Sequence, residues 1–121
     1  MNEGQILKEL LYREEQLMSN VVRTDATKIS ELMEDKSIEV TEAGQRSVYR
    51  SGDTLLSSEG VGFITNDSAT LSDLATDCKL VSYVSARIVA DKQSRTFNSS
   101  IWKMRGSVWK RVYHQGTVCL R

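Results

Sequence analysis

The fold is decided by three stretches of the chain: Lys79–Ala90 (KLVSYVSARIVA), Arg95–Arg105 (RTFNSSIWKMR) and Val108–Leu120 (VWKRVYHQGTVCL). All three are rich in the β-branched and aromatic residues that strands favour, and each is longer than the roughly five or six residues of an ordinary strand. The short breaks between them, Asp91–Gln93 and Arg105–Ser107, have the composition of turns. This part of the sequence therefore predicts a meander of long antiparallel strands.

The first third of the chain has the residue spacing of amphipathic helices. From Ile6 to Val22, apolar side chains recur every three or four positions, with charged side chains between them. Thr24 or Asp25 can cap a second, shorter helix that runs to Asp35. We expect these two helices to form a hairpin.

Shorter elements connect the helices to the long strands. Ser37–Thr41 alternates as a strand and leads into a turn at Gly44, since glycine accepts a positive φ. A brief third helix is expected over Ser51–Leu56, ended by the glycines that follow. Ser68–Leu74 is a further strand candidate with broken alternation.

Together these elements predict an α+β fold, with a cone-shaped, curved antiparallel sheet wrapped around three N-terminal helices. A strongly twisted sheet can bend around the helices, bury their apolar stripes on its concave face and leave a pocket at its open end. Residues 1–121 are expected to form a single domain, because a chain of 121 residues has room for one core. Apolar residues on both faces of the strands indicate that a second copy covers the convex face, so the chain is expected to be a homodimer. They are Val84, Ile88, Phe97 and Ile101 on one face, and Val81, Tyr83, Trp102 and Met104 on the other.

Composition excludes several classes of protein. Forty per cent hydrophobic and 26% charged residues are ordinary for a globular domain, and sixteen basic residues balance sixteen acidic ones. We expect no nucleic-acid partner, because the basic residues of the 103–111 hairpin are typical of a solvated sheet edge. We expect no membrane association and a cytoplasmic protein, since no apolar run is long enough for a membrane span and the N-terminus does not resemble a signal peptide.

The sequence predicts no cofactor and no metal site. Cys78 and Cys119 lie far apart without a neighbouring histidine cluster, which favours two buried thiols over a disulfide or a zinc site. Asp67, Asp73 and Asp77 lack the spacing of a calcium loop, and no glycine-rich phosphate loop follows a strand.

Two longer motifs carry a resemblance to a known family. They are Leu32–Val40 (LMEDKSIEV) and the pair Ser99–Met104 (SSIWKM) and Val108–Thr117 (VWKRVYHQGT). From about Gln5 to Thr117 the chain resembles the nuclear transport factor 2-like superfamily, and within it the SnoaL-like domains of unknown function related to ketosteroid isomerases. The resemblance implies a cone of sheet with three helices, usually dimeric. It implies a fold better than an activity, because this scaffold hosts isomerases, cyclases, hydrolases and binding domains.

The residues of a ketosteroid isomerase are missing. The family places a carboxylate base at the end of the first strand, where this chain has Val40 or Thr41. Leu17 falls near the family's tyrosine on the first helix, and Ser99–Met104 contains no acid. The resemblance therefore does not imply isomerase activity.

A second relative is the association domain of calcium/calmodulin-dependent protein kinase II, whose pocket is lined by arginines. The matching positions here are Ser85, Ser100 and Gln115, with Arg87 and Arg111 two and four positions away. This match also implies which strand residues face the pocket, a polar, aromatic and mostly neutral set suited to a small organic ligand held by hydrogen bonds and stacking. The predicted ligand-binding residues are Tyr83, Ser85, Arg87, Asn98, Ser100, Trp102, Tyr113 and Gln115, with Val81 facing the same way.

Two titratable residues remain as candidates for chemistry. His114 is the single histidine, but no nucleophile partner is identifiable, and alternation places it opposite to Tyr113 and Gln115, toward a dimer contact or a structural hydrogen bond. Glu39 is either a solvated carboxylate or, if desolvated, a base with a raised pKa.

Three functions stay open. The preferred hypothesis is a dimeric small-molecule-binding domain, non-catalytic or weakly catalytic. The rival is an acid/base enzyme of isomerase, cyclase or hydrolase type that acts on a small hydrophobic carbonyl compound through Glu39, Tyr83 or His114. The third is an assembly module that acts through its convex face.

Overall fold

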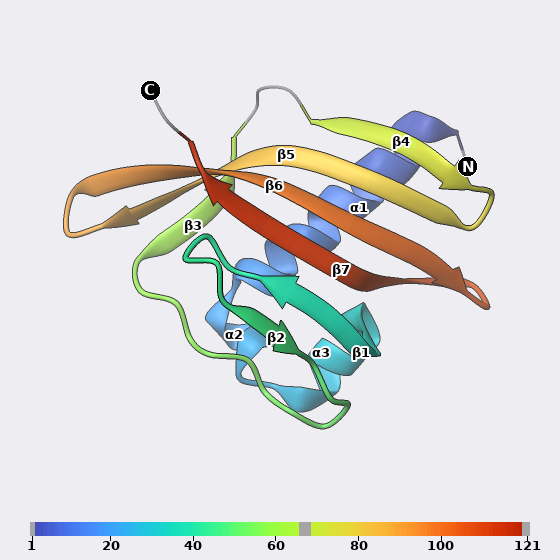
Figure 1. The fold of residues 1–121 in the computed structure, drawn as a ribbon, viewed down its shortest axis with the longest axis horizontal. Helices are drawn as coiled ribbons and strands as arrows, with labels where there is room; N and C mark the ends of the chain where they lie inside the picture. The colour runs from blue at the N-terminus through green and yellow to red at the C-terminus, as the bar shows by residue number, and fades with distance from the viewer. Residues whose placement is uncertain (1, 66–68, 120–121) are drawn as a thin grey trace.

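Three helices and seven strands make up the described part of the chain, residues 2–65 and 69–119 of a computed structural model (Figure 1). All three helices lie against one face of a curved sheet, and α1 runs along the long strands. The predicted α+β cone is confirmed. The helices are α1 (Glu3–Met18), α2 (Asn20–Arg23) and α3 (Ala26–Leu32), and the strands are β1 (Met33–Val40), β2 (Arg46–Val48), β3 (Val61–Ile64), β4 (Thr70–Ala75), β5 (Cys78–Val89), β6 (Lys92–Arg105) and β7 (Val108–Val118).

Capping side chains set the helix boundaries. Asn2 and Gln5 form a reciprocal capping box that begins α1. The helix ends at Met18, because Ser19 turns extended and its hydroxyl caps α2 instead. The expected single helix over 6–22 is therefore two helices. Asp25 caps α3 by accepting hydrogen bonds from two backbone N–H groups, so that cap prediction is confirmed.

The sheet has the strand order β2-β1-β7-β6-β5-β3, and β4 also pairs with β5. The predicted antiparallel meander is confirmed for β5, β6 and β7. The sheet as a whole is mixed rather than antiparallel, because β1 pairs with β7 in parallel. Parallel pairing makes β7 an interior strand and closes the cone against the hairpin of β1 and β2.

The expected helix over 51–56 is wrong. Gly52 has a φ of 97°, a left-handed conformation that interrupts a helix. Asp53 N–H closes one turn on the carbonyl of Arg50, but the chain does not continue as a helix. Ser51 N–H instead donates to the Asp35 carboxylate, and Leu55 N–H donates to the carbonyl of Arg23. Its place as third helix is taken by α2, and β2 and β3 were not expected. Asp67, Ser68 and Leu120 lie outside the described residues.

The core fills the space between α1, α3 and the concave face of the sheet. Its fully buried members alternate along β5 and β6, so each strand turns every second side chain toward the helices. The central residues of this core are Leu10, Leu17, Ile29, Leu32, Val81, Tyr83, Trp102 and Trp109. None of the helices over residues 2–65 and 69–119 has the length and apolar character that a membrane crossing requires.

Candidate functional site

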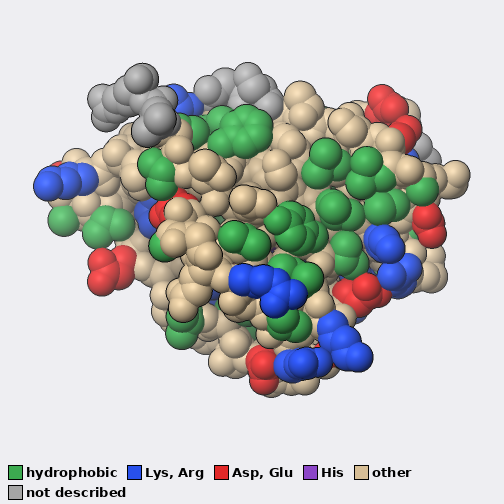
Figure 2. Space-filling model, viewed as in Figure 1, with side chains coloured by type: hydrophobic (Ala, Val, Ile, Leu, Met, Phe, Trp, Pro, Cys, Tyr) green, Lys and Arg blue, Asp and Glu red, His purple; other side chains and the backbone are tan. Residues whose placement is uncertain are grey.

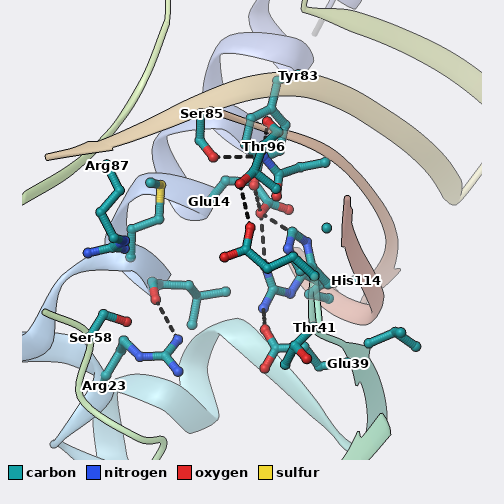
Figure 3. Close-up of a pocket in the computed structure, with 17 residues that line it drawn as sticks. Glu14, Arg23, Glu39, Thr41, Ser58, Tyr83, Ser85, Arg87, Thr96 and His114 are labelled. Carbon is teal, nitrogen blue, oxygen red and sulfur yellow. Dashed lines mark hydrogen bonds and ion pairs between the residues drawn. The ribbon is translucent and has the colours of Figure 1, made fainter. Parts of the chain in front are cut away.

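A cavity of about 230 Å³ lies where α1 faces the concave side of the sheet (Figure 3). We call it the inner cavity. Polar and charged side chains predominate in its wall. The lining residues are Glu14, Leu17, Met18, Arg23, Glu39, Val40, Thr41, Glu42, Ser58, Tyr83, Ser85, Arg87, Thr96, Asn98, Arg111, His114 and Gly116.

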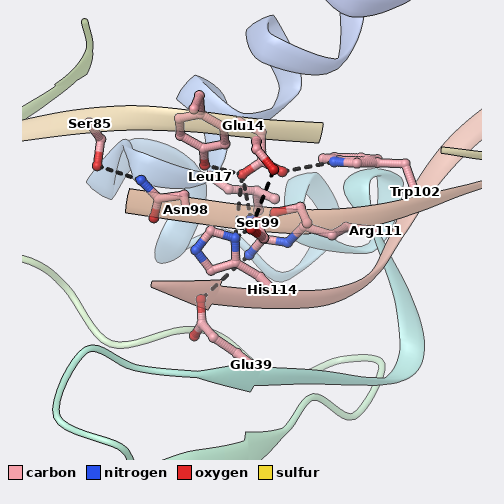
Figure 4. Close-up of polar contacts among 12 residues, drawn as sticks. Glu14, Leu17, Glu39, Ser85, Asn98, Ser99, Trp102, Arg111 and His114 are labelled. Carbon is pink, nitrogen blue, oxygen red and sulfur yellow. Dashed lines mark hydrogen bonds and ion pairs between the residues drawn. The ribbon is translucent and has the colours of Figure 1, made fainter. Parts of the chain in front are cut away.

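Glu14 of α1 is the centre of the site, and its carboxylate is 0% exposed. Arg111 donates to one carboxylate oxygen at 2.8 Å, and the indole Nε1 of Trp102 donates to the other at 2.8 Å (Figure 4). The hydroxyl of Tyr83 also donates to this carboxylate. Three donors from three strands thus hold one buried charge.

The attraction between Glu14 and Arg111 outweighs the cost of burying their charges. Burial alone would raise the pKa of Glu14, but Arg111, His114 and hydrogen bonds from Tyr83 and Ser100 outweigh it, so its pKa lies below the ordinary value. Burial likewise disfavours charged Arg111, yet Glu14 and Glu39 raise its pKa. Glu14 and Arg111 therefore form a buried ion pair at neutral pH. Burial and the charge of Glu14 raise the pKa of Tyr83 well above its usual range, so Tyr83 stays a donor.

His114 lies inside the cavity as a neutral imidazole. Burial first, and then the nearby charge of Arg111, lower its pKa to about 4. Its Nδ1 is 2.5 Å from Ser100 Oγ and 3.7 Å from a carboxylate oxygen of Glu14. The structural hydrogen bond expected for His114 is present, but the side chain faces the concave side rather than a dimer contact.

A bulge in β7 explains that orientation. Trp102 pairs with Arg111 and the adjacent Ile101 pairs with Tyr113, so Val112 is an extra residue without a partner in the ladder. Arg111 faces the helices before the bulge. His114 and Gly116 face the helices after it, opposite Ser100 and Asn98.

Two predicted site residues, Tyr113 and Gln115, therefore point away from the pocket rather than into it as expected. Tyr113 and Gln115 lie on the outer face, where the Tyr113 hydroxyl donates to Gln115 at 2.7 Å, and neither lines the inner cavity. Strict alternation fails here because the extra residue, Val112, moves each later side chain of β7 to the opposite face of the sheet.

The remaining predicted site residues gather around the cavity. Tyr83, Ser85, Arg87 and Asn98 line it, and Asn98 donates to Ser85 Oγ at 2.8 Å. Ser100 and Trp102 lie just behind the wall, bonded to His114 and Glu14. Their role in binding a ligand stays a prediction.

The wall is charged, which corrects the expectation of a mostly neutral pocket. Arg23 and Arg87 lie together on one side of the cavity, with His114 on the other (Figure 3). Arg87 donates to the carbonyl of Glu59 at 2.7 Å, and Arg23 donates to the carbonyls of Leu56 and Leu17. Within the described part of the chain, neither guanidinium forms an ion pair with a carboxylate.

Gly62 of β3 provides room for this arrangement. A Cβ at this position would lie 2.7 Å from Arg87 Nη2 and 3.0 Å from the methyl group of Met18.

Burial lowers the pKa of Arg23, although the charge of Glu39 opposes that shift. Two cations thus lie at the cavity with only backbone carbonyls as their close acceptors.

Glu14 was missed from the sequence. It stands four residues after Leu10 and three before Leu17, in the middle of an apolar stripe. A carboxylate on the buried face of a helix is a signal of a buried polar partner. The equivalents of the isomerase residues, Val40, Thr41 and Leu17, line the cavity without supplying an acid.

The described residues hold no group of three or more His, Cys, Asp or Glu side chains arranged for a metal ion. Cys78 and Cys119 are free thiols, half-buried rather than buried.

Comparison with solved structures shows the fold. An NTF2-like protein of unknown function in nutrient uptake from Rhodospirillum rubrum has 21% identity, with 90% of this chain and 97% of that chain covered and a TM-score of 0.62. The chain has the nuclear transport factor 2-like fold. An NTF2-like protein of unknown function from Prochlorococcus marinus has 13% identity over 100% of this chain and 96% of that one, with a TM-score of 0.69.

A third similar structure is the hub homology domain of calcium/calmodulin-dependent protein kinase II from Chlamydomonas reinhardtii. It has 13% identity over 95% of this chain and 99% of that chain, with a TM-score of 0.67. No protein-family profile and no curated protein sequence matches the chain. The nuclear transport factor 2-like fold is thus shown by structure, and the closer placement among SnoaL-like domains stays a prediction.

Proposed function

We propose that this chain is a small-molecule-binding domain whose inner cavity holds a small organic carboxylate. One observation carries the proposal: the guanidinium groups of Arg23 and Arg87 face the cavity without a carboxylate partner among the described residues. A ligand carboxylate would supply the charge-assisted hydrogen bonds that backbone carbonyls supply only weakly. A volume of about 230 Å³ limits the ligand to a small molecule.

The other polar groups fit a binding role. Asn98 and Ser85 are linked to each other and can orient a second polar group of the ligand. Tyr83, Trp102 and Arg111 hold Glu14, which stiffens the wall. Preorganised walls reduce the entropy lost when a ligand binds.

Proton transfer is the second candidate, favoured by the neutral imidazole of His114 in the cavity wall. Two facts place it second. A histidine with a pKa of about 4 is a weak base at neutral pH. The carboxylate of Glu14 already accepts bonds from Tyr83, Trp102 and Arg111, so it is poorly disposed to take a substrate proton.

The test is a titration with sodium benzoate and with benzamide, its uncharged analogue, followed by ¹H–¹⁵N NMR. Benzoate is expected to shift the amides of Ser85, Asn98 and His114, and benzamide to bind at least about tenfold more weakly. Arg87→Gln should weaken benzoate binding about tenfold. Arg50→Gln, at an exposed position after β2, is the matched control and should bind as the wild type does. Equal affinities for the two probes, or shifts elsewhere, contradict the proposal.

The proposal includes a homodimer formed by the outer face of the sheet. Apolar side chains face one another across the register on that face: Leu80 with Ile101, Val84 with Phe97, and Ile101 with Tyr113. Figure 2 shows hydrophobic side chains gathered on this face, with most charged side chains toward its edges. Self-association is further supported by the similarity to domains described as association domains of the kinase.

Light scattering at micromolar concentration tests the dimer. Phe97, which is 48% exposed, would be buried by the partner, so Phe97→Glu should give a monomer. Val21→Glu, at an exposed apolar position on α2, should leave the dimer intact. A wild-type monomer would refute this part of the proposal and leave the inner-cavity proposal untouched.

A further inference from the structure

The inner cavity has carboxylates as well as guanidinium groups in its wall. Arg23 and Arg87 lie on one side, and Glu39 lies on the other side with His114 (Figure 3). Glu42 belongs to the wall too. The arginines come from α2 and β5, whereas the two glutamates come from β1 and the turn after it. Different elements thus bring opposite charges to one space.

These opposite charges are held apart. Within the described chain no ion pair joins Arg23 to Glu39, although the charge of Glu39 is near enough to raise the pKa of Arg23. Backbone carbonyls hold the guanidinium groups of Arg23 and Arg87 in place. Parallel pairing with His114 fixes the backbone of Glu39. The two signs therefore face the cavity without neutralising each other by direct contact.

Glu39 is the carboxylate with capacity for a further donor. Its side chain lines the cavity and is 22% exposed, and its one contact among the described residues is the 3.5 Å contact with Arg111. A carboxylate can accept about four hydrogen bonds. Glu14, in contrast, already accepts from Tyr83, Trp102 and Arg111. A cationic donor in the cavity would therefore bind Glu39 rather than Glu14.

Glu42 adds a second carboxylate, at an exposed position of the wall. Thr96 Oγ1 donates to its Oε2 at 2.8 Å, the bond drawn from Thr96 in Figure 3. This bond joins the turn after β1 to β6 and so keeps the carboxylate at the cavity. An anionic group on this side would be repelled by both glutamates, and a cationic group would be attracted.

The rest of the wall fits a ligand that bears both charges. Leu17 and Met18 of α1 and Val40 of β1 line the cavity and can contact a carbon skeleton. The ionised groups of the described wall are three carboxylates and three guanidinium groups, so they have no net charge. Electrostatic complementarity to separated charges of both signs favours a dipolar ligand over one with a single sign.

We propose that the inner cavity binds a zwitterion, an amino carboxylate with a short apolar body between its two charges. Its carboxylate binds Arg23 and Arg87, as in the proposed function on which this inference rests. Its ammonium group binds Glu39 through charge-assisted hydrogen bonds. A dicarboxylate is rejected, because its second anionic group would meet Glu39 and Glu42.

The experiment compares three benzoates that share the ring and the carboxylate and differ only in the group opposite. At neutral pH, para-(aminomethyl)benzoate is a zwitterion, para-methylbenzoate a monoanion and terephthalate a dianion. Each is titrated into ¹⁵N-labelled protein and followed by NMR. The wild type should bind the zwitterion about tenfold more tightly than the monoanion, and the dianion at least about tenfold more weakly. Only the zwitterion should strongly shift the amides of Glu39 and Val40.

Glu39→Gln removes the charge of the ammonium partner and keeps the shape of the side chain. This variant should lose the preference for the zwitterion, and it should bind para-methylbenzoate more tightly because a repulsion is gone. Glu15→Gln, at an exposed position of α1, is the control and should keep the tenfold preference. Thermal unfolding shows whether each variant is folded. The comparison of the three benzoates on the wild type decides the matter even if Glu39→Gln does not fold.

The inference is overturned if the aminomethyl group brings no gain, if terephthalate binds as tightly as para-methylbenzoate, or if a folded Glu39→Gln keeps the preference. In each of these cases, binding of para-methylbenzoate at the inner cavity would leave the carboxylate proposal standing. If neither para-methylbenzoate nor para-(aminomethyl)benzoate binds, the proposed function fails and the inference fails with it.

Discussion

The indole Nε1 of Trp102 donates a 2.8 Å hydrogen bond to the carboxylate of Glu14, which lies 88 residues earlier in the chain. Both side chains are fully buried. The contact joins α1 to the middle of β6, and Arg111 and Tyr83 complete it from the neighbouring strands. A buried polar network thus fixes how the first helix sits on the sheet.

Glu14→Gln should destabilise the fold by about 3 kcal/mol, because it leaves the guanidinium of Arg111 buried with only the weak 3.5 Å contact to Glu39. Urea unfolding followed by tryptophan fluorescence measures this loss. Glu15→Gln, one residue away and exposed, is the control and should stay within about 0.5 kcal/mol of the wild type. A Glu14→Gln protein as stable as the control would show that the network contributes no stability.

Stability should fall as the pH is lowered from 6.5 to 4. The folded protein keeps His114 neutral down to a pKa of about 4, mainly through burial and Arg111, whereas the ordinary value is 6.5. The unfolded chain therefore binds more protons in this window, and acidification costs on the order of 3 kcal/mol. Glu14, with its lowered pKa, adds to the loss only below its ordinary value of 4.5.

Urea midpoints measured across this pH range check that dependence. His114 is the single histidine, so His114→Gln should flatten the curve between pH 6.5 and about 5. If the stability of His114→Gln depended on pH as steeply as that of the wild type, a group other than His114 would cause the dependence.

Gly60→Ala should be more harmful than Gly44→Ala. Both glycines have positive φ, 71° and 81°, so either alanine is strained by about 1 kcal/mol. At Gly60 a Cβ would also lie 2.0 Å from the carbonyl oxygen of Ile88, whereas at Gly44 nothing lies within 4 Å. Differential scanning calorimetry should show that Gly60→Ala loses at least about 2 kcal/mol more unfolding free energy than Gly44→Ala does. Equal losses would place the Gly60 loop away from β5.

Gly62→Ala should weaken benzoate binding several-fold while changing stability by less than about 1 kcal/mol. Its Cβ would meet the end of the flexible Arg87 side chain, which can move away at little cost but then leaves the inner cavity. Parallel NMR titration and thermal unfolding measure the two effects. Binding as tight as in the wild type would show that Arg87 does not contact the carboxylate, and this prediction rests on the proposed function.

Alternation in sequence separated the two faces of β5 and β6, and the resemblance to the kinase association domain implied which of them faces inward. Val81, Tyr83, Asn98, Ser100 and Trp102 all face inward, because no irregularity interrupts these strands between them. The same rule fails beyond Val112, since a bulge depends on how two strands fit together and leaves no local signature in VWKRVYHQGT.

Glu14 and Arg23 were missed from the sequence for a different reason. They come from α1 and α2, and only tertiary packing brings them to one cavity with Glu39 of β1, which the sequence did single out. The segment 51–56 has helix-like composition, yet its backbone groups find better partners in Asp35 and Arg23. Long-range contacts here override local preference.

The parallel pairing of β1 with β7 also bears on how the protein is made. Ribosomes release a chain from its N-terminus, so β1 emerges long before the strand that flanks it in the finished sheet. Glu14 is made earlier still, and its partner Arg111 lies 97 residues further along the chain. Until β7 has been synthesised, the carboxylate of Glu14 has no Arg111 to pair with, and burying it against the sheet would cost the desolvation energy that the pair later offsets. The first helix can therefore reach its final place on the sheet only after almost the whole chain has been made.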